Sequence, residues 1–179
     1  MLHLNFTPFP RLETERLFLK EITIEDAGSV FAMRCKEEVM QYLDRPKAKT
    51  IEDALALINQ ITTGWQRNES ITWGLYQKGH ADLIGTLGFW QIQKQHHRAE
   101  IGYMLQPPMQ GKGYMSEALR AVMNYGFSVM QLHSAKANVN PSNEKSIRLL
   151  ERHGFVREVY FRNNIFTTEN FWTVRCILL

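Results

Sequence analysis

A glycine-containing segment between a predicted strand and a predicted helix places the strongest constraint on this chain. Residues 110–115 read Gln-Gly-Lys-Gly-Tyr-Met, and a strongly helical run begins near Tyr114. Gly111 and Gly113 allow the backbone to pass close to a bulky anion, with several N–H groups pointing inward. The positive end of the following helix faces the same place, and Lys112 adds a positive charge. The segment therefore predicts a binding site for a phosphate or pyrophosphate group.

Length and composition limit the classes of protein to which this chain can belong. Its 179 residues are enough for one domain with a buried core, and we expect a single domain over residues 1–179. The chain is 44% hydrophobic and 11% aromatic, which argues against intrinsic disorder. The net charge of +3 permits an anionic ligand, but it is too small to indicate nucleic acid as a partner.

The sequence shows no sign of a membrane span, a secretory signal or a metal site. No apolar stretch approaches the roughly 20 residues that cross a bilayer. Residues 1–6 lack the charged start and the apolar block of a signal peptide. Cys35 and Cys176 are far apart, and no Cys-x-x-Cys or Cys/His cluster has zinc spacing. We therefore expect a cytoplasmic protein with reduced cysteines, no metal and no membrane partner.

The pattern of hydrophobic residues predicts that strands and helices alternate along the chain. Strands are predicted for residues 14–22, 71–77, 82–91, 98–105, 133–139, 155–161 and 171–179. Helices are predicted for residues 24–36, 51–65, 114–130 and 141–153. Residues 50–53 resemble a capping box, and Asn140 before Pro141 looks like an N-cap with proline at the first helical position. This order favours an α/β (α+β) fold, a mixed sheet with helices on its faces.

Two common nucleotide-binding motifs do not fit the glycine-containing segment. A Walker A motif requires Gly-x4-Gly-Lys-Ser/Thr, which residues 111–115 do not supply. The dinucleotide fingerprint requires three glycines and an acidic residue about twenty positions further on, near the end of the next strand. Only Gly111 and Gly113 are present, and no acidic residue stands at that place.

A second polar motif lies in the last predicted helix, which ends at His153 and Gly154. Asn143 and Ser146 are three positions apart, so on a helix their side chains face the same way. An amide and a hydroxyl on one face could bind a ligand that itself contains amide groups. The alternative is that Asn143 belongs to the helix cap and Ser146 is a solvated surface residue.

Together these segments resemble the GNAT superfamily of acyl-CoA-dependent N-acetyltransferases. The likeness is greatest to its RimJ/RimL-like branch of ribosomal-protein N-terminal acetyltransferases. Residues 12–19, 99–105, 110–118 and 143–155 look like the first strand, the central strand, the pyrophosphate loop and the last helix of that branch. The resemblance implies a GNAT-like mixed, mostly antiparallel central sheet with helices on both faces, splayed at the cofactor slot. It also implies acetyl-CoA as the acyl donor, without a metal.

The resemblance also implies which residues would bind acetyl-CoA. Gln110 and Gly113 match the family loop, whereas Met115 replaces its last small residue. Backbone N–H groups across the loop would hold the pyrophosphate, and a backbone N–H of the central strand would bind the acetyl carbonyl oxygen. Asn143 would hold an amide of the pantetheine arm. The expected cofactor contacts are Met104, Leu105, Gln110, Gly111, Lys112, Gly113, Tyr114, Met115 and Asn143.

Glu100 and Ser146 are the expected catalytic residues. Glu100 is the candidate general base and lies on the strand face opposite Tyr103; the alternative is an ordinary carboxylate paired with Arg98 or solvent. Many superfamily members carry a proton-donating tyrosine seven residues after the helix asparagine, but here Leu150 stands at that position. The RimL-like branch instead resembles this chain in having a serine at the Ser146 position, which would protonate the leaving thiolate.

The sequence leaves the acceptor open. The expected reaction transfers acetyl from acetyl-CoA to a primary amine by direct attack. A protein N-terminal α-amine is favoured slightly over a polyamine, an amino acid or an antibiotic. A CoA-binding module without catalysis and a nucleotide-binding domain are the alternatives from other classes. Both a monomer and a homodimer remain open.

Overall fold

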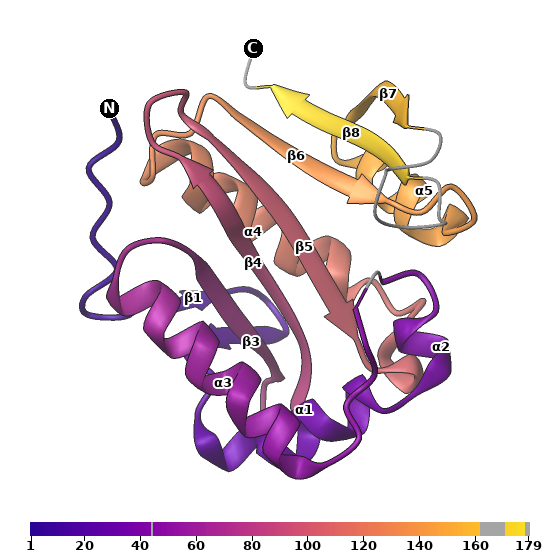
Figure 1. Ribbon diagram of the computed structural model, residues 1–179. Helices are drawn as coiled ribbons and strands as arrows, with labels where there is room; N and C mark the ends of the chain where they lie inside the picture. Colours follow the sequence, from indigo (N-terminus) through magenta and orange to yellow (C-terminus); the bar gives the residue numbers. More distant parts are fainter. Residues whose placement is uncertain (44, 162–170, 178–179) are drawn as a thin grey trace.

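The computed structural model describes residues 1–43, 45–161 and 171–177, and within them one mixed sheet of eight strands forms the centre of the molecule (Figure 1). The strands are β1 (Leu12–Glu13), β2 (Leu17–Lys20), β3 (Ile71–Gln77), β4 (Leu83–Gln93), β5 (Arg98–Leu105), β6 (Ser134–Val139), β7 (Val156–Phe161) and β8 (Phe171–Ile177). They lie in the order β1-β2-β3-β4-β5-β6-β8-β7. Adjacent strands in the described sheet are antiparallel except β5 and β6, which are parallel. The predicted mostly antiparallel mixed sheet is therefore confirmed.

Helices cover both faces of this sheet, as predicted (Figure 1). The helices are α1 (Ala27–Arg34), α2 (Glu37–Met40), α3 (Ile51–Gln66), α4 (Tyr114–Ser128) and α5 (Glu144–Arg152), with short 3₁₀ turns at Ile24–Asp26 and Pro107–Met109. On one face, the apolar stripe of α4 and part of α5 pack with Leu87, Phe89 and Ile101 in the larger core. On the other face, α1 and α3 form a second core around Tyr76 and Leu83.

The lengths of several elements follow from local signals in the sequence. β3 and β5 have the predicted bounds, and α3 begins at the predicted capping box, in which Thr50 and Asp53 bond each other's backbone. The stripe predicted for α4, from Met115 to Gly126, is buried. Strong periodicity and unambiguous breakers therefore sufficed for these elements.

The sheet opens between its two central strands. β5 pairs with β4 along its length, down to Leu105, whereas its parallel pairing with β6 ends at Glu100 opposite Lys136. Beyond that pair the two strands diverge (Figure 1). Pro107 then ends the extended segment, because proline cannot supply a ladder N–H. The predicted splayed slot is confirmed.

Two of the sequence predictions that were wrong in their bounds misplace a turn. Within the strand predicted for residues 14–22, only Leu17–Lys20 is a strand, because Thr14 N–H bonds Leu17 O and turns the chain between β1 and β2. The helix predicted from Pro141 begins at Glu144, since Asn140 starts a turn in which its side chain accepts from Ser142 N–H. Proline at the second position of a turn is as favourable as at a helix start.

Candidate active site

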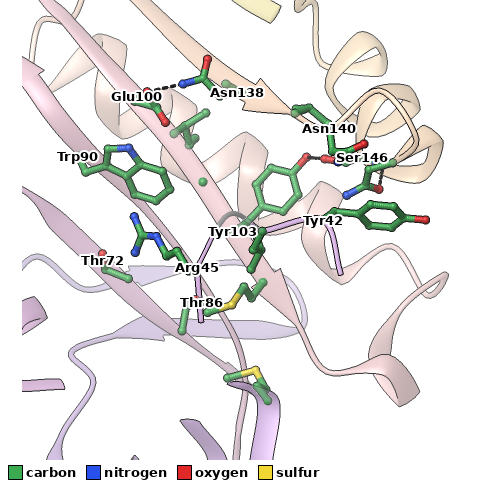
Figure 2. A pocket seen from close by; sticks show the side chains of 18 of the residues that line it. Tyr42, Arg45, Thr72, Thr86, Trp90, Glu100, Tyr103, Asn138, Asn140 and Ser146 are labelled. Carbon is green, nitrogen blue, oxygen red and sulfur yellow. Dashed lines mark hydrogen bonds between the residues drawn. The ribbon is translucent and has the colours of Figure 1, made fainter. Parts of the chain in front are cut away.

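A cavity of about 530 Å³ lies where β5 and β6 separate (Figure 2). Its walls come from α1, the segment between α2 and α3, α3 itself, strands β3 to β6 and the start of α5. Of the predicted site residues, Glu100, Met104, Asn143 and Ser146 line it. The predicted pyrophosphate loop, residues 110–115, is not part of this lining and lies at the start of α4. The structure therefore divides the predicted residues between a cavity and a loop.

Glu100 is a buried carboxylate with two cationic or polar partners from β6. It is 6% exposed, Asn138 Nδ2 donates to its Oε2 over 2.8 Å, and Lys136 Nζ lies 3.3 Å from the same oxygen. Its ion-pair partner is thus Lys136 and not Arg98, the partner considered from the sequence. Asn138 and Lys136 both contact this one oxygen, so the other oxygen of Glu100 can serve a ligand in the cavity.

Tyr103 and Ser146 form a pair of hydroxyl groups on the other side of the slot. Tyr103 Oη and Ser146 Oγ are 2.6 Å apart (Figure 2). Burial raises the pKa of Tyr103 to about 12, although the hydrogen bond with Ser146 acts in the opposite direction. Tyr103 therefore keeps its proton throughout the neutral range. Sequence reasoning missed it, because the family's tyrosine was sought on the last helix, at Leu150, whereas here a tyrosine reaches the site from β5.

The register of the sheet places Glu100 and Tyr103 on opposite faces of β5. Glu100 pairs across the strands with Trp90, on the face where α1 and α3 pack. Tyr103 pairs with Leu87, which belongs to the core under α4. Because β6 has left β5 at this level, both side chains reach the same cavity. A group held in the slot would have a carboxylate on one side and two hydroxyls on the other.

The backbone of β5 presents alternate peptide groups to the open slot. Gln106 N–H bonds Ile84 O on β4, over 2.9 Å. Because direction alternates along a strand, the N–H of Leu105 points away from β4, whereas that of Met104 points toward it. Gln110 Nε2 donates to Leu105 O over 3.1 Å and holds this strand end against the loop. The alternation favours Leu105 as the N–H donor, while Met104 contributes its side chain to the cavity wall.

The loop at the start of α4 has the geometry of an anion site. Gly111 and Gly113 have φ angles of 74° and 83°, in the left-handed region that glycine adopts without strain. A Cβ at Gly111 would meet no atom within 4 Å, so the surface beside it is open. Tyr114 and Met115 are buried and anchor the loop, which leaves its backbone N–H groups at the helix N-terminus. The loop thus fits a pyrophosphate group.

A cluster formed by Thr14, Arg16 and Glu117 holds this loop against the first hairpin. Glu117 accepts from Thr14 Oγ1 at 2.6 Å, from Arg16 N–H at 2.8 Å and from Arg16 Nε at 2.7 Å. Arg16 also donates to Lys112 O over 3.0 Å and lies 4.6 Å from the ring centroid of Tyr114. Burial opposes the charge of Glu117, but the hydrogen bonds from Thr14 and Arg16 outweigh it and lower the Glu117 pKa. This Thr14–Arg16–Glu117 cluster connects the loop with residues 12–19, the first of the four segments that carry the family resemblance.

Three further side chains in the cavity were not predicted: Arg34, Arg45 and Trp90. The Trp90 ring crosses over Gly102, where an added Cβ would lie 2.0 Å from it, so glycine is required there. The guanidinium of Arg45 lies 5.3 Å from the Trp90 ring centroid. Arg34 and Arg45 come from the early helices and the segment between them, and Trp90 comes from β4; the sequence alone assigned none of them a role.

The structure offers no sign of a metal centre or a membrane span within the residues it describes. In that part of the chain, no three His, Cys, Asp or Glu side chains gather as metal ligands. Among the described helices, none is long and apolar enough to cross a bilayer.

The fold and the site together define an acyl-CoA-dependent transferase. A parallel strand pair that splits beside a cavity leaves room for an extended arm, and the glycine-containing loop has a geometry that fits a pyrophosphate. A carboxylate and two hydroxyls reach the point where the arm would end.

Comparison with known proteins identifies the family. Residues 16–156 match the model of the acetyltransferase (GNAT) domain. The uncharacterized N-acetyltransferase YoaA of Bacillus subtilis is 38% identical over 158 residues, 88% of this chain and 89% of YoaA. The ribosomal protein uS5-alanine N-acetyltransferase of Escherichia coli is 31% identical over 110 residues, 61% of this chain and 55% of that enzyme. A GNAT acetyltransferase from Bacillus anthracis superposes with a TM-score of 0.82 at 26% identity, covering 94% and 98% of the two chains.

The chain belongs to the GNAT family of acetyltransferases, and it is an acetyl-CoA-dependent N-acetyltransferase. The resemblance inferred from the four sequence segments is thereby confirmed, including the likeness to ribosomal-protein acetyltransferases.

Proposed function

We propose that this enzyme transfers an acetyl group directly from acetyl-CoA to a primary amine bound in the cavity on the α1–α3 side. A protein N-terminal α-amine is the first candidate acceptor, and a small amine is the second. The observation that carries the proposal is the placement of Glu100 and the Tyr103–Ser146 pair on opposite sides of one slot.

The residues of this chain divide the reaction between them. The amine nitrogen forms a bond to the thioester carbonyl carbon, and Glu100 receives the amine proton, directly or through water. The Leu105 N–H donates to the carbonyl oxygen as negative charge develops there. The carbon–sulfur bond then breaks, and the electron pair leaves on sulfur, which faces the Tyr103–Ser146 side. Acetyl-CoA supplies the activated acyl group, held at its pyrophosphate by the loop at residues 111–115 and at its amide arm by Asn143.

The free-energy cost of deprotonating the acceptor sets how much help Glu100 must give. An α-amine with a pKa near 8 costs about 1.4 kcal/mol at pH 7, whereas a lysine ε-amine with a pKa of about 10.4 costs roughly 4.6 kcal/mol. Lys136 and Asn138 hold the Glu100 carboxylate in place at the slot. The smaller cost of deprotonating an α-amine favours a protein N-terminus or an amino acid over a lysine side chain as the acceptor.

On the sulfur side, the hydroxyl pair acts as a hydrogen-bond donor. Full proton transfer to a thiolate with a pKa of about 8.5 from Tyr103, whose pKa is about 12, would cost roughly 5 kcal/mol. A hydrogen bond to an ionised sulfur stabilises it by roughly 1.5–3 kcal/mol without that cost. We therefore assign to Ser146, with Tyr103 donating to it, the stabilisation of the departing thiolate, and to water its final protonation.

Asn143 keeps one polar group for a ligand in this scheme. It is the N-cap of α5, and its Oδ1 accepts from Ser146 N–H over 3.1 Å. Its amide nitrogen remains a donor, suited to a carbonyl of the pantetheine arm. The capping interaction and the proposed ligand contact are therefore compatible, because each uses a different end of the side chain.

Release of CoA with a panel of amines tests the proposal. N-terminal peptides, amino acids and polyamines are offered to the wild type and to the Glu100→Gln, Ser146→Ala double variant, with free thiol as the readout. We expect at least one amine to accelerate release in the wild type far beyond the double variant, while calorimetry finds equal acetyl-CoA affinity. Equal rates in both proteins for every amine would contradict direct transfer through this site.

A further inference from the structure

Two arginines form part of the cavity wall on the acceptor side. Arg34 is the last residue of α1, and Arg45 lies between α2 and α3; both line the cavity. Arg34 is half-buried and donates to Pro46 O over 3.3 Å. Arg45 is placed over Trp90 by a cation–π contact. Neither residue belongs to the predicted pyrophosphate loop at residues 110–115.

Among the described residues that line this wall, positive charges outnumber negative ones. The described lining holds three cationic side chains, Arg34, Arg45 and Lys136, and one carboxylate, Glu100, which Lys136 already neutralises. No carboxylate of the described residues forms a salt bridge with Arg34 or Arg45. The nearby Asp53 is engaged by the backbone N–H groups of residues 49 and 50.

The two arginines also act on each other. Burial, and then the charge of Arg45, lower the pKa of Arg34, although the charge of Asp53 acts in the opposite direction. The half-buried guanidinium of Arg34 and the exposed one of Arg45 repel each other, and an anion between them would relieve that repulsion. The planar donor fork of arginine matches a carboxylate in a bidentate geometry.

The arginines lie at a fixed place relative to the proposed base. Trp90 pairs with Glu100 across β4 and β5, and the same indole carries Arg45. In Figure 2, Trp90 lies between Glu100 and Arg45. An acceptor with its amine at Glu100 can therefore extend along the indole until its other end meets the guanidinium groups. Gly102 keeps that path open, because any side chain there would displace the indole.

We infer that the acceptor carries a carboxylate, separated from its amine by several bonds, which Arg34 and Arg45 bind while the amine faces Glu100. The inference rests on the proposed function and narrows its acceptor. It makes polyamines poor substrates, because a second ammonium group would face two cations. The carboxylate can belong to a free amino acid or to an acidic side chain near a peptide N-terminus, and the experiment separates these two sources.

Two matched series of acceptors test the inference. The first is 5-aminopentanoate, its amide and 1,5-diaminopentane, which place a carboxylate, a neutral group or an ammonium at the same distance from the amine. The second is one short peptide with N-terminal alanine followed by glutamate, glutamine or lysine. In at least one series we expect kcat/KM to fall about tenfold or more from the acid to the amide, and further to the cation. The series that shows the preference identifies the source.

Variants connect the preference with the two arginines. Arg34→Gln and Arg45→Gln should each bring the acid-to-amide ratio of kcat/KM close to one, mainly through KM. Arg45→Glu should reverse the order, so that 1,5-diaminopentane becomes the better acceptor. Lys49→Gln removes a positive charge from the same exposed segment outside the cavity lining and should leave the ratio unchanged. Acetyl-CoA affinity, measured by calorimetry, should be the same in all four variants.

The possible failures are distinguishable. If no amine accelerates CoA release by the wild type beyond the Glu100→Gln, Ser146→Ala double variant, the proposed function itself fails. If neutral or cationic acceptors are used as well as acidic ones by the wild type, the inference fails and the proposed function stands. A drop in kcat/KM of equal size for acid and amide in Arg45→Gln would mean that Arg45 only packs on Trp90, and this also overturns the inference.

Discussion

The predicted pyrophosphate loop and the cavity differ in how the chain builds them. The loop at residues 110–115 is one continuous segment that works through backbone N–H groups, and its glycines adopt the left-handed conformation. The cavity is assembled from three helices, four strands and the loops between them, and its lining consists of side chains such as Glu100 and Tyr103. Only the cavity depends on where distant segments meet.

This difference predicts which property of the enzyme a substitution in each region will change. In the proposed function, the loop would bind a group that is the same for every enzyme using acetyl-CoA, so a local motif suffices. The cavity must match one acceptor, and its wall on the α1–α3 side carries Arg34, Arg45 and Trp90, which play no part in the loop. Substitutions in the loop should therefore change donor affinity for every acceptor, whereas substitutions in the cavity should change kcat or acceptor choice.

The largest effect that separates the regions is expected from Glu100→Gln. We expect kcat at pH 7 to fall about 100-fold, because general-base help is lost, with acetyl-CoA affinity unchanged. The loss should shrink as pH rises toward the pKa of the acceptor amine, about 8 for an α-amine, since more amine is then already deprotonated. A pH profile of kcat for both proteins measures this.

Glu144→Gln provides the control for that experiment. Glu144 is an exposed carboxylate on α5, close in sequence to Ser146, and its ion pair with Arg148 lies outside the cavity. It should leave the pH profile unchanged. An unaltered profile in Glu100→Gln would instead remove Glu100 from the reaction and leave a water-mediated route.

A second test concerns Glu117, which ties the loop to the first hairpin. Glu117→Gln loses hydrogen bonds to a charged acceptor, so we expect the free energy of unfolding to fall by about 1–3 kcal/mol. The affinity for acetyl-CoA should fall whichever acceptor is present, and the choice of acceptor should be unchanged. Chemical denaturation and calorimetry measure the two quantities.

The dependence of the free energy of unfolding on acid pH distinguishes the contribution of Glu117. Its pKa is lowered in the folded protein, so the unfolded chain takes up the proton first as pH falls below about 4.3. The stabilising contribution is therefore present above that pH and is lost as pH falls through the folded-state pKa. The Glu117→Gln variant should lack this loss. Glu37→Gln, which breaks an exposed pair with Lys47, should change stability by at most about 1 kcal/mol and leave donor affinity intact.

A third test uses two glycines with the same backbone conformation. Gly113 at the start of α4 and Gly79 in the β3–β4 turn both have φ of 83°. Alanine at either position should destabilise the protein by about 1–2 kcal/mol, the cost of a left-handed residue with a Cβ. Only Gly113→Ala should weaken acetyl-CoA binding. Equal donor affinity in the two variants would show that the loop does not bind the pyrophosphate.

The sequence predicted the loop and much of the fold because their signals are local. β3, β5 and α3 were bounded correctly by periodicity, breakers and a capping box. The start of α5 was misplaced at Asn140 because asparagine before proline begins a turn as readily as a helix. Local signals of equal strength cannot be ranked without the packing around them.

The cavity was predicted only where a family motif named its residues. Glu100 and Ser146 were expected, and they do share one cavity. Tyr103 was not, because its meeting with Ser146 depends on β5 losing its partner β6 just before it. Arg45 was not, because its position over Trp90 depends on how the segment after α2 folds back. No spacing rule along the chain encodes these encounters.

The smallest expected effect concerns the hydroxyl pair, and Tyr103→Phe and Tyr125→Phe isolate it. Burial raises the pKa of both tyrosines, that of Tyr103 to about 12. Because the unfolded chain then loses each proton first, near pH 10, each tyrosine contributes stability that is lost as pH rises from about 10 toward the folded-state pKa. Both variants should flatten this alkaline decline, measured by denaturation between pH 9 and about 12.

Only Tyr103→Phe should also lower kcat, by about fivefold, because Ser146 loses the donor that orients its hydroxyl toward sulfur. An unchanged kcat would mean that the pair does not reach the leaving thiolate, and the division of the slot into a base side and a thiolate side would then rest on Glu100 alone.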